Sequence, residues 1–480
     1  MKSIIVPREE LERREECGII GIISKEKKEM AHDLYFGLYA LQHRGQEGAG
    51  IAVAYEKRKV HYYKKLGLVS EVFNEEKLSE FPLTKCGIGH VRYSTTGSNN
   101  VVNTQPVVFY GRWGRMAVAI NGCINNCDTL KSRLIREGHI FQSSIDSEVV
   151  AALINEYSQN SVEEGVEKAC LELVGTYSLV VMADGKLIGT RDPLGLKPMT
   201  IGEKNGDMIF ASETCAIDSI NGHVIRDVKP GEIIIIDEDL KITSRQLPTC
   251  GKRKFCVFEH VYLARSDSSF DGMAVYDARY NCGKYMAELF KIDADVVAGV
   301  PDSATVAARG YSEASGIPYV DALSKNRYIG RTFIQPSQSM RENSVKIKLN
   351  AIRNNIKGKR LILIDDSIVR GTTSKKIIQL LRDNGAKEVH MLIASPIVAW
   401  PCFYGVDMST KDQLIGAYRN AEEICKEIGT DSLHYLPLEY LTKACGGTEE
   451  NDFCCACFSG KYPIDITKYN NGEFKLDLEK

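Results

Sequence analysis

The sequence predicts two domains of different class, an α+β domain followed by an α/β domain with a parallel sheet. The chain has 480 residues, which is more than one hydrophobic core usually organises. Up to about residue 250, short strand-like runs and helical stretches are mixed. From about residue 285, short β-rich runs are separated by helical stretches, which is typical of βαβ units and a parallel sheet.

In the first half, apolar runs predict strands at 17–23, 48–55, 86–95 and 116–122, and a fifth strand followed by an acidic turn at 231–242. Residues 30–45 predict a helix, because Leu34, Leu38 and Leu41 fall on one face and Gly45 is placed to end it. A polar, basic connector follows at 247–254.

In the second half, strands are predicted at 293–301, 316–322, 359–366 and 388–396, with a helix at 374–388. A cysteine-rich piece at 445–457 and a polar tail end the chain.

Composition excludes several classes of function. The net charge of −2 gives no basic field for nucleic acid or acidic lipid, and the apolar runs are far too short to cross a membrane. Acidic residues fill the stretch before Cys17, so it is not a secretory signal. We therefore expect a cytoplasmic protein whose fifteen cysteines are reduced and serve metal or catalytic roles.

The most specific motif is LILIDDSIVRGTTS at 361–374. An apolar run ends in Asp365 and Asp366, and a small polar loop then leads into a helix beginning near Ser374. A helix N-terminus attracts phosphate, whereas paired acids suit ribose hydroxyls or a divalent metal. The alternative is an ordinary strand–turn–helix with capping acids. The combination closely resembles the phosphoribosyl pyrophosphate (PRPP) motif of type I phosphoribosyltransferases.

This resemblance implies that Asp365 and Asp366 contact the ribose hydroxyls or Mg²⁺. It also implies that the 5′-phosphate is cradled by a loop of five residues: Arg370, Gly371, Thr372, Thr373 and Ser374. The upstream run GVPDSA at 299–304 would hold pyrophosphate or metal, with Ser303 as a ligand of Mg²⁺.

A basic stretch at 324–343 has no clear period and carries Lys325, Arg327, Arg331 and Arg341. It is either a solvated loop or a mobile lid that closes over a pyrophosphate leaving group and excludes water. Beside the phosphate motif we favour the lid, with Lys325 and Arg331 binding PRPP.

The Cys-Gly pair at Cys17 follows a leader with nine charges in 16 residues. Cys17 is either a small apolar residue at the head of a strand or a nucleophile exposed by removal of the leader. An internal cysteine would need a nearby base. An N-terminal cysteine has its own α-amino group, whose pKa is about 7.7–8.0, as the base.

Three further runs of the first half are compatible with a nucleophile of this kind. Arg92 could clamp a carboxylate, Asn121 and the Gly122 N–H could stabilise an oxyanion, and Asp146 could hold an ammonium group. Alone, Arg92 could be a surface charge and Asp146 a helix cap. Together they describe a pocket for an α-amino acid beside a thiolate that attacks an amide.

The runs CGIIGI, LQHRGQEGAGI, HVRYSTTG, NG and D-S-E, in this order, resemble class II glutamine amidotransferase domains with an N-terminal nucleophile. The resemblance implies an αββα N-terminal-nucleophile hydrolase sandwich. It also implies Cys17 as nucleophile and Asn121 and Gly122 as oxyanion hole. The glutamine binders would be Arg92, Thr95 and Asp146.

The two motif sets together resemble the glutamine phosphoribosylpyrophosphate amidotransferase family. We expect a propeptide (1–16), a class II amidotransferase domain (17–250), a type I phosphoribosyltransferase domain (251–445) and a cysteine-containing segment (446–480). The resemblance implies that ammonia from L-glutamine displaces pyrophosphate from PRPP, giving 5-phosphoribosylamine, the first committed step of purine synthesis.

The same resemblance implies one Mg²⁺ per subunit, feedback inhibition by AMP, GMP and ADP, and a homo-oligomer, dimer or tetramer. Two rival functions predict different sequence features. An amidotransferase acting on a sugar phosphate or aspartate would lack the 361–374 motif. A PRPP-sensing regulator would need neither Cys17 with a glutamine pocket nor the lid.

The cysteines near the end of the chain leave several possibilities open. Cys454-x-x-Cys457 could be half of a zinc site, a redox pair or part of an iron–sulfur site. No second C-x-x-C completes a zinc ribbon. The resemblance to the cluster-bearing branch of the family implies one 4Fe–4S cluster per subunit on Cys256, Cys402, Cys454 and Cys457.

Overall fold

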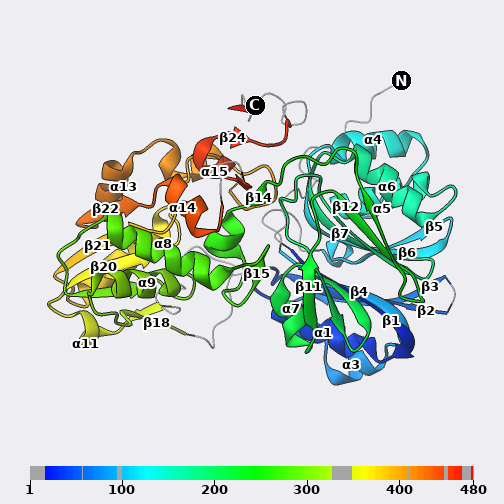
Figure 1. Ribbon diagram of the computed structural model, residues 1–480, viewed down its shortest axis with the longest axis horizontal. Helices are drawn as coiled ribbons and strands as arrows, with labels where there is room; N and C mark the ends of the chain where they lie inside the picture. The colour runs from blue at the N-terminus through cyan, green and yellow to red at the C-terminus, as the bar shows by residue number, and fades with distance from the viewer. Residues whose placement is uncertain are drawn as a thin grey trace.

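The computed structural model describes residues 17–56, 58–93, 100–326, 349–408, 410–447 and 452–466, together with the backbone of 477–478. The described chain forms two lobes (Figure 1). Residues of the first half make one lobe, and residues after about 270 make the other.

The first lobe contains two antiparallel sheets. One has the order β11-β9-β10-β1-β4-β2-β3 and the other β13-β12-β8-β7-β6-β5. The strands of the first sheet are β1 (Gly18–Lys28), β2 (Gly48–Tyr55), β3 (Lys59–Leu66), β4 (Thr84–Arg92), β9 (Thr200–Lys204), β10 (Asp207–Ala211) and β11 (His223–Asp227). Those of the second are β5 (Val107–Gly111), β6 (Gly114–Ile124), β7 (Gly175–Ala183), β8 (Lys186–Arg191), β12 (Glu232–Ile236) and β13 (Ile242–Gln246).

Three apolar cores arrange these sheets and their helices in four layers. Side chains of both sheets, such as Ile88 and Val180, pack in the central core. The outer core of the first sheet contains α1 (Met30–Ala40), α2 (Val69–Val72) and α7 (Thr214–Ser219), beside α3 (Glu75–Ser79). The outer core of the second contains α4 (Cys127–Arg136), α5 (Asp146–Tyr157) and α6 (Val162–Glu172). This is the expected αββα sandwich.

The first predicted helix ends earlier than its sequence suggests. It stops at Ala40, and residues 41–44 form turns, so the expectation that Gly45 ends the helix is wrong. Gly45 instead lies against the end of β4, where an added Cβ would stand 2.6 Å from the carbonyl carbons of Val91 and Arg92. Glycine is therefore needed for this close approach of two backbones.

The second lobe is built on a parallel sheet of order β17-β20-β21-β22. Its strands are β17 (Val296–Gly299), β20 (Arg360–Asp365), β21 (Glu388–Ile393) and β22 (Ser432–Tyr435). Helices α8 (Val275–Leu289), α9 (Thr305–Ser315) and α14 (Leu438–Ala444) pack together, and α12 (Thr372–Asp383) packs with α13 (Ala421–Ile428). The expected α/β domain with a parallel sheet is confirmed.

The strand predicted at 316–322 is reduced to one parallel bridge between Val297 and Tyr319. Pro318 has no N–H to extend the ladder, although its carbonyl accepts from Val297 N at 2.9 Å. This bridge still places the segment beside β17, at the edge of the sheet.

Short elements join the lobes. β14 (Phe255–Cys256) pairs in parallel with β23 (Phe453–Cys454), which brings the connector and the end of the chain together. A single π-helical turn, η3 (Glu259–Leu263), follows, then β15 (Ser269–Phe270) with β16 (Met273–Ala274). Further short pieces are η2 (Val101–Asn103), β18 (Leu323–Lys325), β19 (Leu349–Ala351), α11 (Arg353–Ile356), η4 (Lys411–Gln413), η5 (Ile415–Ala417), α15 (Ala456–Ser459), β24 (Lys461–Tyr462) and β25 (Asp477–Leu478).

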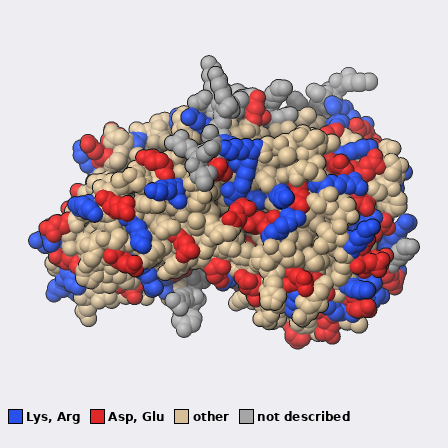
Figure 2. Space-filling view, viewed as in Figure 1, with Lys and Arg blue, Asp and Glu red and all other residues tan. Residues whose placement is uncertain are grey.

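The surface agrees with the small net charge. On the face shown in Figure 2, lysines and arginines are interspersed with aspartates and glutamates. Within the described ranges, no helix has the length and apolar character needed to cross a bilayer.

Candidate active sites and the cysteine cavity

Cys17 lies at one end of the sandwich, between β1 of the first sheet and β6 of the second. It precedes β1 and is fully buried. Gly18 pairs with Val91, so Arg92, the last residue of β4, lies at the same end as Cys17. From the opposite sheet, Asn121 accepts a hydrogen bond from Cys17 N through Oδ1 at 3.4 Å. The nucleophile predicted from the sequence is thus held between both sheets.

Asn121 and Gly122 are neighbours in β6, and the geometry accounts for both residue types. The Asn121 side chain is buried, and its Nδ2 has no hydrogen-bond partner within the described chain. Such a buried donor is costly unless a ligand uses it. At Gly122 an added Cβ would stand 2.0 Å from the Thr176 carbonyl oxygen, so only glycine fits. The pair can therefore offer donors to an oxyanion beside Cys17.

The charged residues predicted to bind glutamine are both buried. Burial lowers the pKa of Arg92 to about 10. Burial raises the pKa of Asp146, the first residue of α5, to about 6, although its Oδ2 accepts from Ile124 N at 3.2 Å. A carboxylate and an ammonium group of a bound amino acid would offset these desolvation costs. Thr95 lies in 94–99, outside the described residues.

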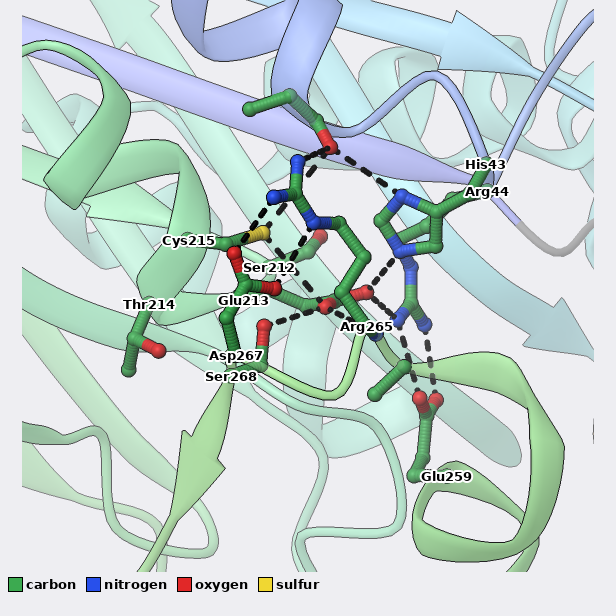
Figure 3. A network of polar contacts seen from close by, with 12 residues as sticks. His43, Arg44, Ser212, Glu213, Thr214, Cys215, Glu259, Arg265, Asp267 and Ser268 are labelled. Carbon is green, nitrogen blue, oxygen red and sulfur yellow. Dashed lines mark hydrogen bonds and ion pairs between the residues drawn. The ribbon is translucent and has the colours of Figure 1, made fainter. Parts of the chain in front are cut away.

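Arg44 lies between two buried acids, Glu213 and Glu259 (Figure 3). Its Nε donates to the Cys17 carbonyl at 3.0 Å. Its terminal nitrogens contact Glu213 at 2.5 Å and Glu259 at 2.8 and 3.0 Å. Burial alone would lower the pKa of Arg44, but the two carboxylates more than reverse this and raise it. The guanidinium is therefore held charged and rigid beside the nucleophile.

The second site lies at the carboxyl end of the parallel sheet. Asp365 ends β20, and Asp366 follows it. The Asp366 carboxylate accepts hydrogen bonds from the hydroxyls of Ser303 and Ser367, the latter at 2.6 Å. Burial raises the pKa of both acids, and at Asp365 the neighbouring Asp366 raises it further. Two crowded buried carboxylates are suited to a cation or to sugar hydroxyls.

The loop after these acids leads into α12, as predicted. Gly371 adopts φ +74° and caps the helix, which begins at Thr372, two residues before Ser374. Thr372, Thr373 and Ser374 form its first turn, where backbone N–H groups lack intrahelical partners. Arg370 is anchored to Gln413 Oε1 at 2.8 Å. A phosphate would fit this helix N-terminus.

Lys325, the last residue of β18, forms an ion pair with Asp302 near the same end of the sheet. β18 pairs in antiparallel with β19, so Lys325 lies opposite Leu349. Arg327, Arg331 and Arg341 lie in 327–348, outside the described residues. The leader, residues 1–16, is outside them as well.

The four cysteines predicted to bind a cluster line one cavity. β14 and β23 place Cys256 opposite Cys454. Cys402 and Cys457 complete the set around this cavity, which Leu196 and Lys197 of the first lobe also line. Burial raises the pKa of Cys256 to about 12, and neighbouring thiols contribute to raising the pKa of Cys454 and Cys457.

Across the described ranges, no group of three or more His, Cys, Asp or Glu side chains is gathered closely enough to hold a metal ion. All fifteen cysteines are free thiols. Mg²⁺ commonly uses only one or two protein carboxylates together with water and substrate phosphates, which the paired acids could supply. Sulfurs that bind different irons of one cluster are also spread more widely than ligands of a single ion.

Similarity to known proteins follows the same division of the chain. Residues 90–219 match a glutamine amidotransferase domain, and residues 276–394 match a phosphoribosyl transferase domain. An amidophosphoribosyltransferase of Methanocaldococcus jannaschii is 47% identical over 467 residues, covering 94% of this chain and 98% of that protein. The chain belongs to the amidophosphoribosyltransferase family.

Other members support this assignment. The amidophosphoribosyltransferase of Bacillus subtilis is 46% identical over 457 residues, covering 94% of this chain and 95% of that protein. The structure of B. subtilis glutamine PRPP amidotransferase complexed with ADP and GMP has a TM-score of 0.88 at 43% identity, covering 96% of this chain and 99% of that chain. As a member of this family, the chain catalyses glutamine-dependent amidation of PRPP in purine biosynthesis.

Sequence reasoning assigned no role to Arg44, Glu213 or Glu259. Glu213 lies 169 residues and Glu259 lies 215 residues after Arg44, so no rule based on sequence spacing could bring the three together. A partial signal exists, because Glu213 and Glu259 interrupt otherwise apolar or small-residue runs. An acid in such a run must find a buried cation, since burying it alone is costly.

Proposed function

We propose that Cys17 is the nucleophile of the amidotransferase reaction and that residues 1–16 are removed to free its α-amino group. The observation that carries this is the Asn121 amide, whose Oδ1 accepts from Cys17 N and whose Nδ2 is buried without a partner in the described chain. One side chain can thus orient the amine that acts as base and stabilise the charge that develops on the substrate.

In this mechanism the Cys17 thiol loses its proton to the α-amine and attacks the glutamine amide carbon. The oxyanion is stabilised by Asn121 Nδ2 and the Gly122 N–H. The amine returns the proton to the departing nitrogen, which leaves as NH₃, and water hydrolyses the thioester to glutamate. Arg92, Thr95 and Asp146 hold the α-carboxylate and α-ammonium groups of glutamine.

At the second site, NH₃ attacks C1 of the ribose and pyrophosphate leaves. We assign Asp365 and Asp366 to the ribose hydroxyls and, with Ser303, to one Mg²⁺. Residues 370–374 would hold the 5′-phosphate, and Lys325 and Arg331 the pyrophosphate. Mg²⁺, when bound, neutralises leaving-group charge, and catalysis otherwise depends on positioning. Support comes from the buried, crowded acids and the helix N-terminus beside them.

One 4Fe–4S cluster per subunit would be bound by the four cysteines that line one cavity, Cys256, Cys402, Cys454 and Cys457. The cluster would tie the end of the chain to the connector and the first lobe. Since neither Cys17 nor Asp366 lines this cavity, we assign the cluster a structural role. Binding requires thiolates, so the raised thiol pKa values imply that loading releases protons.

Regulation, assembly and location complete the proposal. The B. subtilis structure contains ADP and GMP, which supports feedback inhibition by AMP, GMP and ADP here. A second similar structure is that of an allosteric regulatory enzyme of purine biosynthesis. We further propose a homo-oligomer, dimer or tetramer, and a cytoplasmic location, where reduced thiols persist.

Cys17→Ala tests the core of this proposal. Glutamine-dependent turnover should vanish, and high ammonium at alkaline pH should restore phosphoribosylamine formation, because NH₃ then arrives without the first site. The variant is made with and without residues 2–16, and intact-mass analysis of the wild type should show a chain beginning at Cys17. Full glutamine-dependent turnover in Cys17→Ala, or active wild type retaining Met1, would overturn the proposal.

A further inference from the structure

Arg44 is anchored both by the sandwich and by the segment that joins the two lobes. Glu213 belongs to the sandwich, between β10 and α7, whereas Glu259 belongs to η3, after the connector. Both carboxylates are fully buried, and Glu259 makes the bidentate pair with Arg44. Bidentate pairing fixes the plane of a guanidinium as well as its position. The orientation of Arg44 Nε, and with it the bond to the Cys17 carbonyl, therefore depends on where η3 docks.

The same segment contacts the surroundings of the second site. Arg279 of α8 donates to the carbonyls of His260 and Ala264, both at 2.8 Å, and to Ser266 Oγ at 3.1 Å. Arg279 and His260 also line a small cavity together with Ser303 and Asp366. Residues 259–268 therefore lie between the cavity beside Asp366 and the Arg44 contact with the Cys17 carbonyl.

Glu213 is fastened to this segment too. Its carboxylate accepts from Arg265 N at 3.0 Å and from Ser268 Oγ at 2.6 Å, besides Arg44 and His43 (Figure 3). Burial would raise the pKa of Glu213, but His43 and Arg44 lower it overall. Both acids that hold Arg44 are therefore connected to residues 259–268. The sandwich by itself supplies only one of the two, Glu213.

We propose that Glu259 is a positioning residue for the first reaction: it holds Arg44 so that the Cys17 backbone, and thus the amine and thiol, face the glutamine amide. Docking of η3 thereby makes glutamine cleavage dependent on the second lobe. This inference rests on the proposed role of Cys17. It assigns no contact with either substrate to Glu259 or Arg44, which act through the Cys17 carbonyl.

Glu259→Gln tests the inference, because it keeps an acceptor but removes the charge and the bidentate pair. The matched control is Asp267→Asn, an acid-to-amide change in the same segment at an exposed side chain that pairs with Arg265. For each variant, the glutamine-dependent and the ammonium-dependent rates of pyrophosphate release are measured. Thermal unfolding and the rate of Cys17 alkylation by iodoacetamide are recorded as well.

In Glu259→Gln, the ratio of glutamine-dependent to ammonium-dependent turnover should fall at least tenfold through kcat, while the glutamine KM changes less than threefold. Alkylation of Cys17 should slow, and Asp267→Asn should stay within twofold of wild type throughout. Arg44→Lys should reproduce the loss, since lysine cannot pair bidentately. If Glu259→Gln does not fold, Glu259→Asp and Arg44→Lys are judged by the same ratio.

An unchanged ratio, or a parallel fall of both rates, would overturn the inference, as would an equal loss in the control. Failure of the proposed function gives a different result, because Cys17→Ala would then retain glutamine-dependent turnover whatever Glu259→Gln does.

Discussion

Asn121→Ala should separate the activity of this protein from its stability. The wild-type side chain is fully buried, with Nδ2 unpartnered in the described structure and Oδ1 bonded to Cys17 N at the long distance of 3.4 Å. Removing one oxyanion donor typically lowers kcat by about 10²–10³, or about 2.7–4 kcal/mol. A buried polar group without a partner costs about 1–3 kcal/mol. Its removal therefore offsets most of the packing that is lost.

Glutamine-dependent kcat should fall by about a hundredfold or more. The free energy of unfolding should change by less than about 1 kcal/mol. Ammonium-dependent turnover should be unaffected. The assay is steady-state pyrophosphate release with each nitrogen source, together with urea unfolding of the same preparations.

Asn126→Ala is the matched control. Asn126 is also buried, but its Nδ2 donates to Glu172 O at 2.8 Å and its Oδ1 accepts from Val174 N at 3.0 Å. Its loss should cost about 1–3 kcal/mol of stability and leave glutamine kcat nearly unchanged. The reasoning is refuted if Asn121→Ala keeps its glutamine kcat within threefold, or if it destabilises the protein as much as Asn126→Ala does.

Three further predictions concern the other sites. Gly371→Ala forces an alanine to φ +74° and puts its Cβ 2.7 Å from Ile415 Cδ1. The resulting strain of roughly 1–2 kcal/mol should raise the PRPP KM and lower the unfolding temperature. An unchanged PRPP KM would contradict the assignment of this loop to the 5′-phosphate. Because burial raises the pKa of Asp146 to about 6, protonation below that pH removes its attraction for the glutamine ammonium, so the glutamine KM should rise as pH falls from 7 to 5; an equal rise in Asp146→Asn would count against this role. Anaerobically purified protein should contain about four irons per chain, lost in Cys457→Ser but retained in Cys455→Ser, and stoichiometric zinc without iron would exclude the cluster.

The sequence predicted the features that depend on local pattern. Alternating or continuous apolar runs predict β1, β2, β4, β6 and β12 and three strands of the parallel sheet, β17, β20 and β21, because strand formation follows nearby side chains; β22 was not predicted. Asp365, Asp366 and the phosphate loop were predictable for a related reason, since a strand end and the following helix N-terminus are adjacent in sequence. The residue-level roles of these groups stay predictions.

The sequence failed where tertiary contacts decide the outcome. The sequence predicts Gly45 as a helix stop, but the absence of a side chain at Gly45 is needed for the close approach of β4, 46 residues away. The strand expected around Tyr319 became one bridge at the sheet edge. The role of Arg44 could not be predicted, because its partners Glu213 and Glu259 come from distant segments. No local pattern indicates that a cation will lie between these two acids.

A buried charge network at the junction of the lobes carries a large desolvation penalty, several kcal/mol for each ion. Apolar side chains would pack the lobes without this penalty, but they would not fix the orientation of a hydrogen-bond donor. Residues 255–268 contribute Cys256 to the cysteine cavity, Glu259 to Arg44 and the His260 carbonyl to Arg279. One short segment therefore contacts the surroundings of both reaction sites, and directional ionic contacts can make the geometry of Cys17 depend on the second lobe where an apolar interface could not.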